Sequence, residues 1–240
     1  MMDRIPNKIH WCWLSGEPIP ENVKEYQKSW RLIGDNPEIK LWDGNSLDWT
    51  LTPKFVQQAL EDKNWQTAAD YVRAYALYTE GGWYFDSDIE LIKKFPEDYF
   101  HHNFIATKEV TDDENFYKMM SERNFKNDSG SPLFGNGINA ALMGAKPGLK
   151  YLKDVMDFYG TLDYSKKDYP SCLFGWYIAP QVYSFVAEKY GYTYEAAEKL
   201  LDDDMFIAPE EFCTNVPYSK KNDVAFAHHK CHASWLERFQ

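Results

Sequence analysis

Asp86 and Asp88, two aspartates separated by one residue, are the residues of this 240-residue sequence best suited to chemistry. They follow Trp83-Tyr84-Phe85, a strongly strand-favouring segment. Because side chains alternate between the faces of an extended strand, we expect both carboxylates to point the same way. Paired carboxylates suit a hard divalent cation, which prefers oxygen ligands and can keep coordination positions free for the oxygens of a diphosphate.

A second pair of charged residues lies on the helix that is expected just before this strand. Residues 67–80 have helical spacing and end at Gly81-Gly82, a common helix stop. Asp70 and Arg73 are three residues apart and so share one face of that helix. As a surface ion pair they would contribute only about 0.2–0.5 kcal/mol. Beside a diphosphate site they could instead bind the hydroxyl groups of a sugar.

The two-aspartate pattern alone is weak evidence, because it occurs twice. The run Asp202-Asp203-Asp204 contains it with no strand before it, and we interpret that run as a solvated turn. The simple alternative for Asp86 and Asp88 is a hairpin turn. The helix, glycine pair and aromatic strand that precede them favour a functional site.

Three segments together resemble glycosyltransferase family 32. Residues 70–88 match its D-x-x-R…L-Y-x-x-G-G-x-Y-x-D-x-D signature, and IPNKIHWCW at residues 5–13 resembles its N-terminal strand. The stretch from His229 to Ser234-Trp235 resembles its C-terminal H-x-x-x-x-S-W. The family includes bacterial capsule and outer-surface polysaccharide transferases and shares its signature with large glucosylating toxins. The middle of the chain matches only loosely.

The resemblance implies a metal site and its ligands. Asp88 would bind the cation directly, and Asp86 would bind it through water or contact the nucleotide ribose. His229 would be the third ligand, since imidazole suits Mn²⁺-type ions. His228 stays open as the alternative, because strand alternation points only one of the two inward.

The same resemblance implies a nucleotide-sugar site around the metal. The residues are Trp13 stacking on the base, Asp70 and Arg73 on the sugar, Asn139 near the transferred sugar, and Ser234 and Trp235 on the diphosphate. Trp11 is expected to be a core residue. Trp235 could equally be a core anchor, and Asn139 a turn residue.

The function implied is a metal-dependent, retaining transfer of a hexose from a nucleoside diphosphate sugar, with UDP favoured, to an acceptor hydroxyl. Mn²⁺ or Mg²⁺ would be the cofactor. The acceptor would be a saccharide or lipid-linked saccharide in surface or capsular polysaccharide synthesis. One alternative is a phosphohydrolase with Asp86 as nucleophile and Asp88 as acid, although such enzymes carry the pair after their first strand. A non-catalytic carbohydrate- or calcium-binding module is another. A nucleotidyltransferase is disfavoured because the glycine-rich phosphate loop is absent.

Composition narrows the partners and the compartment. A net charge of −11 disfavours nucleic acid and allows at most peripheral contact with a membrane. The start of the chain is polar, which argues against a signal peptide, and no apolar run approaches the roughly 20 residues of a membrane helix. The 4 cysteines form no C-x-x-C pair. We therefore expect free thiols and a cytoplasmic protein that can act at the inner face of the membrane.

Strands and helices alternate through the first half, which predicts an α/β architecture with a mixed, mostly parallel sheet flanked by helices. The resemblance to glycosyltransferase family 32 implies that this fold is of the GT-A type. We expect a single domain over residues 1–240 with helical insertions. Residues 1–90 would form the nucleotide-sugar half, and 91–240 the acceptor side and a C-terminal metal and diphosphate loop. Ligands of such sheets bind beyond the carboxyl ends of the strands, where the strands ending near Trp13 and Asp86 would both open.

The expected elements can be given by range. Strands are predicted at residues 5–14, 38–42, 82–85, 104–110, 136–144 after a turn, 205–208 and 224–228; helices are predicted at 21–33, 53–61, 67–80, 148–159, 176–190 and 194–201. Residues 112–135 are polar and are predicted to form a long loop or lid.

Overall fold

The computed structural model describes residues 3–109, 137–164, 178–194 and 198–232. The predicted loop at 112–135, Ser234 and Trp235 lie outside the described residues. The α-helices are α1 (Glu21–Ser29), α2 (Lys54–Glu61), α3 (Trp65–Glu80), α5 (Lys150–Tyr159) and α6 (Ala179–Ala187). The strands are β1 (Lys8–Cys12), β2 (Glu38–Trp42), β3 (Gly82–Phe85), β4 (Ile89–Leu91), β5 (Phe104–Thr107), β6 (Leu142–Ala145), β7 (Lys199–Leu201), β8 (Met205–Ala208), β9 (Thr214–Asn215) and β10 (Ala227–His229).

A seven-stranded sheet forms the centre of the molecule, in the order β2-β1-β3-β6-β5-β8-β7. Strands β2, β1, β3, β5 and β8 run one way, because β1 is parallel to both β2 and β3 and β5 is parallel to β8. Strands β6 and β7 run the other way. The predicted mixed, mostly parallel sheet flanked by helices is confirmed.

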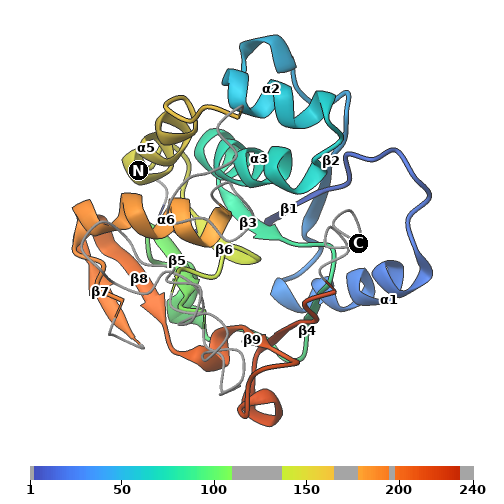
Figure 1. Ribbon diagram of the computed structural model, residues 1–240. Coiled ribbons are helices and arrows are strands. Elements are labelled where there is room, and N and C mark those ends of the chain that lie inside the picture. The colour runs from blue at the N-terminus through green and yellow to red at the C-terminus, as the bar shows by residue number, and fades with distance from the viewer. Residues whose placement is uncertain (1–2, 110–136, 165–177, 195–197, 233–240) are drawn as a thin grey trace.

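Other elements cover both faces of this sheet (Figure 1), and each face has its own apolar core. Helices α2, α3, α5 and α6 cover one face, where buried residues such as Val56, Leu77 and Tyr183 pack together. Helix α1, the 3-10 turn Trp30–Ile33 and a second, smaller sheet cover the other, around Trp30 and Trp83. Burial on both faces explains why β3 is apolar throughout.

The double glycine fixes the sharp passage from α3 into β3. Gly81 and Gly82 have φ angles of +65° and +105°, which side-chain-bearing residues rarely adopt. A Cβ on Gly82 would lie 2.6 Å from the backbone oxygen of Lys8, so the two strands could not approach. The carboxyl ends of β1 and β3 therefore come side by side, as the sequence predicted.

The smaller sheet has the order β4-β10-β9 and was not predicted. Strand β4 follows β3 after a turn, and it pairs antiparallel with β10 from the far end of the described chain. Strand β10 also pairs in parallel with β9. The predicted strand at 224–228 thus begins later, at Ala227, and lies in this second sheet.

Two local predictions are wrong. Residues 199–201, expected to end a helix over 194–201, form β7, which pairs antiparallel with β8. Its alternation of exposed Leu200 and buried Leu201 is that of an edge strand, so pairing with β8 overrides the helical pattern. Asp86 and Asp88 do not extend β3 but lie in a turn, in which the Ile89 amide donates to the Asp86 carbonyl.

Other expectations hold with shorter limits. Strand β1 covers only Lys8–Cys12 of the predicted 5–14, and α1 passes into a 3-10 turn at Trp30. The aspartate run Asp202–Asp204 is an exposed 3-10 turn, as expected. Among the described residues, no helix has the length and apolarity needed to span a bilayer.

Candidate functional site

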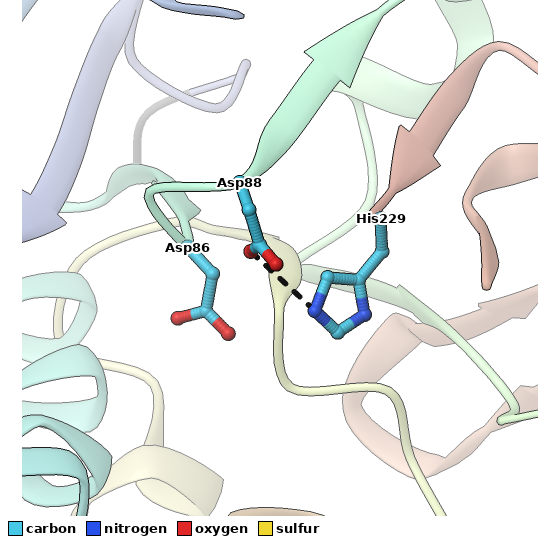
Figure 2. A group of neighbouring side chains, drawn as sticks. All are labelled: Asp86, Asp88 and His229. Atoms are coloured by element: carbon cyan, nitrogen blue, oxygen red, sulfur yellow. Dashed lines mark ion pairs between the residues drawn. The ribbon is translucent and has the colours of Figure 1, made fainter. Parts of the chain in front are cut away.

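Asp86, Asp88 and His229 meet at the carboxyl end of β3 (Figure 2). Each contributes one potential ligand atom, and these atoms all lie within 4.8 Å of one another. His229 Nε2 is 3.5 Å from Asp88 Oδ1. His228 instead directs Nε2 to the carbonyl of Asn222, 3.0 Å away. The structure thus brings His229, and not His228, to the two aspartates.

The small sheet is what brings His229 there. The turn Asp86–Ile89 leads from the central sheet into β4, and the Asp86 amide donates to the Ala141 carbonyl at 2.7 Å. In β4, Ile89 is paired directly with His229 of β10. Residues about 140 positions apart in sequence therefore become neighbours because of one antiparallel register.

The segment after β10 wraps over Asp88. The backbone carbonyl of Asp88 accepts from the Lys230 amide at 3.2 Å, and the Asp88 side-chain Oδ2 accepts from the His232 amide at 2.9 Å. Oδ1 is left facing His229. Asp88 is only 8% exposed, and the His232 amide holds its carboxylate in one orientation.

Asp70 and Arg73 form a buried pair beside the acidic turn. Arg73 Nη2 lies 2.8 Å from Asp70 Oδ1 and 3.4 Å from Asp86 Oδ1, while Nη1 donates to the Ala140 carbonyl at 2.6 Å. Asp70 Oδ2 accepts from the Ala179 amide at the start of α6. The predicted surface alternative for this pair is wrong, since its side chains are 2% and 6% exposed.

Burial is the largest single influence on the pKa of each of these groups. It raises the pKa of Asp70 to about 6, and the Arg73 guanidinium opposes the rise. The pKa of Asp86 is also raised by burial and lowered in part by Arg73. Burial opposes the charge of Arg73, but the neighbouring carboxylates outweigh it and raise its pKa well above the usual value. Burial raises the pKa of the nearby Cys12 thiol to about 12, so Cys12 is not an activated nucleophile.

Asn139 lies on the loop before β6 and is 2% exposed. Its Oδ1 accepts from the Ala141 amide at 3.0 Å, and its Nδ2 lies 3.4 Å from Asn215 Oδ1. Asn215 Oδ1 is also 2.9 Å from His229 Nδ1. Sequence reasoning missed Asn215, because no motif marks it and only the pairing of β9 with β10 places it beside His229.

The two tryptophans of the N-terminal motif differ in exposure as predicted. Trp11 is 4% exposed and packs against Trp30 with ring centroids 5.9 Å apart. Trp13, just past the end of β1, is partly exposed, and its indole Nε1 donates to the Glu17 carbonyl at 2.6 Å. Trp13 therefore presents a ring near the same edge of the sheet as the acidic turn.

The donor set fits a hard or borderline divalent cation. Two carboxylates and one imidazole are ligands that Mn²⁺ accepts, and three protein ligands leave coordination positions for other oxygens. Mg²⁺ would share the carboxylates but is less suited to imidazole.

Comparisons with known proteins point in one direction. The family model for capsular polysaccharide synthesis proteins matches residues 2–167, more than half of the chain. The PaToxG glycosyltransferase aligns with 14% identity and a TM-score of 0.52, over 78% of this chain and 70% of its own. Mouse xyloside xylosyltransferase 1 aligns with 9% identity and a TM-score of 0.50, over 93% of this chain and 97% of its own. A search of curated proteins finds no match.

At these identities the structural likeness establishes the fold, which is that of glycosyltransferases with a GT-A-like sheet. The family match adds to this fold that the related proteins take part in capsular polysaccharide synthesis. Together they support a glycosyltransferase, whereas the finer resemblance to glycosyltransferase family 32 stays a prediction.

Proposed function

Because this chain belongs to the family of capsular polysaccharide synthesis proteins, we propose that it is a metal-dependent enzyme that transfers a hexose from a nucleoside diphosphate sugar to a saccharide acceptor. The observation that carries the proposal is the meeting of Asp86, Asp88 and His229 beside the buried Asp70–Arg73 pair. A cation site and a sugar-binding pair are the two parts that such a donor requires.

Asp88 and His229 are the proposed direct ligands of Mn²⁺ or Mg²⁺, with Asp86 bound through water or to the nucleotide ribose. The cation, when bound, would neutralise charge on the leaving diphosphate. Ser234 and Trp235, outside the described residues, are proposed diphosphate contacts.

Arg73 is proposed to orient the donor sugar. Its two terminal nitrogens are engaged by Asp70, Asp86 and a carbonyl, but its buried Nε has no hydrogen-bond partner among the described residues. That donor is buried from solvent, so a sugar hydroxyl could accept from it only after the neighbouring side chains moved, and the bond would then satisfy a costly unpaired group. Asp70 would fix the guanidinium, and Asn139 would lie near the same sugar. Holding the sugar in a reactive orientation lowers the barrier without a covalent step by the protein.

Trp13 is the proposed stacking partner of the base, with UDP favoured over GDP. We propose retention of the anomeric configuration and an acceptor that is a saccharide or lipid-linked saccharide of a capsular or surface polysaccharide. We propose that the enzyme acts in the cytoplasm, at the inner face of the membrane.

The test is a calorimetric titration of UDP and GDP, each with and without Mn²⁺. We expect UDP to bind with a dissociation constant on the order of micromolar only when Mn²⁺ is present. Asp88→Ala should abolish that binding, because it removes the carboxylate that His229 faces. Asp202→Ala is the matched control, since it removes an exposed aspartate from the second two-aspartate pattern and should bind UDP as the wild type does.

Absence of metal-dependent binding of either nucleotide would refute the proposal. Release of phosphate from a phosphate ester, abolished by Asp86→Ala, would then favour the phosphohydrolase. Binding of free saccharide without any nucleotide would favour the carbohydrate-binding module.

A further inference from the structure

We propose that Asn139 and Asn215 are positioning residues that hold the proton of the neutral His229 ring on Nδ1 and so leave Nε2 bare for the cation. This inference rests on the metal site proposed above. It gives a role to the half-buried Asn215 and adds a second role to the buried Asn139, which is also proposed to lie near the donor sugar.

The first step fixes the orientation of the Asn139 amide. A backbone N–H can only donate, so the Asn139 atom that lies 3.0 Å from the Ala141 amide must be the oxygen. The other end of the same side chain must then be the NH₂ group. This is the end that faces Asn215, at 3.4 Å.

The second step passes this polarity on to the histidine. An NH₂ group donates, so the Asn215 atom that it faces must be the carbonyl oxygen Oδ1. That oxygen also lies 2.9 Å from His229 Nδ1 and can only accept. Nδ1 must therefore carry the hydrogen, and in a neutral imidazole Nε2 is then unprotonated.

The third contact of Nδ1 agrees with this assignment. Cys231 Sγ lies 3.4 Å from His229 Nδ1, but its thiol hydrogen has another acceptor in the His229 carbonyl, 3.6 Å from Sγ. The sulfur does not need the ring nitrogen as an acceptor. Nothing among the described contacts of Nδ1 thus requires it to be bare.

The tautomer matters because a His229 ring with its hydrogen on Nε2 could not bind the cation through that nitrogen. A free histidine ring prefers its hydrogen on Nε2, and here such a hydrogen would point toward Asp88 Oδ1, 3.5 Å away. The ring would then have to exchange its proton before it could bind a cation. Partners that orient a metal-binding histidine typically change metal affinity by about 10–100-fold when they are removed.

The wild-type tautomer can be read directly by two-bond ¹H–¹⁵N correlation spectra of the metal-free chain with ¹⁵N-labelled histidine. The pH should be about 9, where a free imidazole is neutral. His229 is assigned by the signals lost in His229→Gln. We expect a protonated Nδ1 and a bare Nε2. A proton on Nε2 in the wild type overturns the proposal without any need for a variant.

The proposal predicts opposite results for two nearly isosteric variants. In Asn215→Asp the carboxylate still accepts from both Asn139 and His229 Nδ1, so the tautomer stays and Mn²⁺ binds as tightly as in the wild type or more tightly. In Asn139→Asp the new carboxylate cannot donate to Asn215. The Asn215 amide turns its NH₂ group toward that carboxylate and toward Nδ1, and the proton of His229 moves to Nε2.

Calorimetry with Mn²⁺ alone should show about 10–100-fold weaker binding in Asn139→Asp. Simple electrostatics predicts the reverse, because both variants add a negative charge near the cation. Tight Mn²⁺ binding and an Nδ1 proton in Asn139→Asp would overturn the proposal. A protonated Nδ1 in a wild type that binds no Mn²⁺ would instead overturn the metal site on which it rests.

Discussion

His10 gives the sharpest test of how the core below the site is held together. It is fully buried on β1, where Nδ1 accepts from Trp42 Nε1 at 3.0 Å and Nε2 donates to the Gly81 carbonyl at 2.8 Å. His10→Phe removes both bonds at similar volume and leaves two buried groups without partners. At about 1–3 kcal/mol for each such group, the free energy of unfolding should fall by about 2–6 kcal/mol at pH 8.

Lowering the pH should reduce the difference in unfolding free energy between the wild type and His10→Phe. Burial lowers the pKa of His10, and protonation would also set a second N–H against that of Trp42. Below about pH 6.5 the unfolded chain therefore binds a proton that the folded wild type resists. The stability due to neutral His10 is complete above that pH and is lost below it, by up to about 1.4 kcal/mol per pH unit until the folded pKa is reached. His10→Phe has no imidazole to protonate at this position, so its unfolding free energy does not show this loss.

The assay is urea unfolding of both proteins between about pH 8 and pH 5, with the difference in unfolding free energy plotted against pH. His101→Phe is the control, because its side chain is 47% exposed and should change stability by less than about 0.5 kcal/mol. A gap below about 1 kcal/mol at pH 8 would refute the hydrogen-bond reasoning. A gap that stays constant as the pH falls would refute the burial of a neutral ring.

Three further predictions concern the turn, the buried arginine and the cation. Gly82→Ala should lower the unfolding free energy by at least about 2 kcal/mol in urea, because its φ of +105° and the 2.6 Å approach of a backbone oxygen leave no room for a Cβ. Arg73→Leu should cost about 3–5 kcal/mol by the same assay, since it leaves buried carboxylates uncompensated, whereas Arg31→Leu at an exposed position should cost under about 0.5 kcal/mol. Mn²⁺ at about 100 times its dissociation constant should add about 2.7 kcal/mol of stability, an increment that Asp88→Asn should remove and that a chelator should reverse.

Much of the central architecture was predictable because its signals are local. The glycine pair at residues 81–82 stops α3, and the aromatic run at 83–85 forms a buried strand, as expected from their residue types. The exposed turn at Asp202–Asp204 and the buried Trp11 were likewise predicted from their immediate surroundings. In each case conformational preference and apolarity favour the same answer as the fold.

The errors have a common physical cause, which is strand pairing that local residue preferences do not encode. Residues 199–201 have an amphipathic spacing that suits a helix, but the open edge of β8 gains a ladder of hydrogen bonds by taking them as β7. The two aspartates of the acidic turn converge because β3 and β4 belong to different sheets, and not because they alternate along one strand.

The sequence alone determined which chemistry is available: two carboxylates behind a buried strand, an acid and a base one helical turn apart, and a histidine near the end of the chain. Those are properties of residue type and short-range spacing, which the chain carries before it folds. The tertiary structure decided which histidine reaches the aspartates, and that Asn215 stands behind it. It did so because the register of β4, β10 and β9 joins segments far apart in sequence, and no local preference encodes that register.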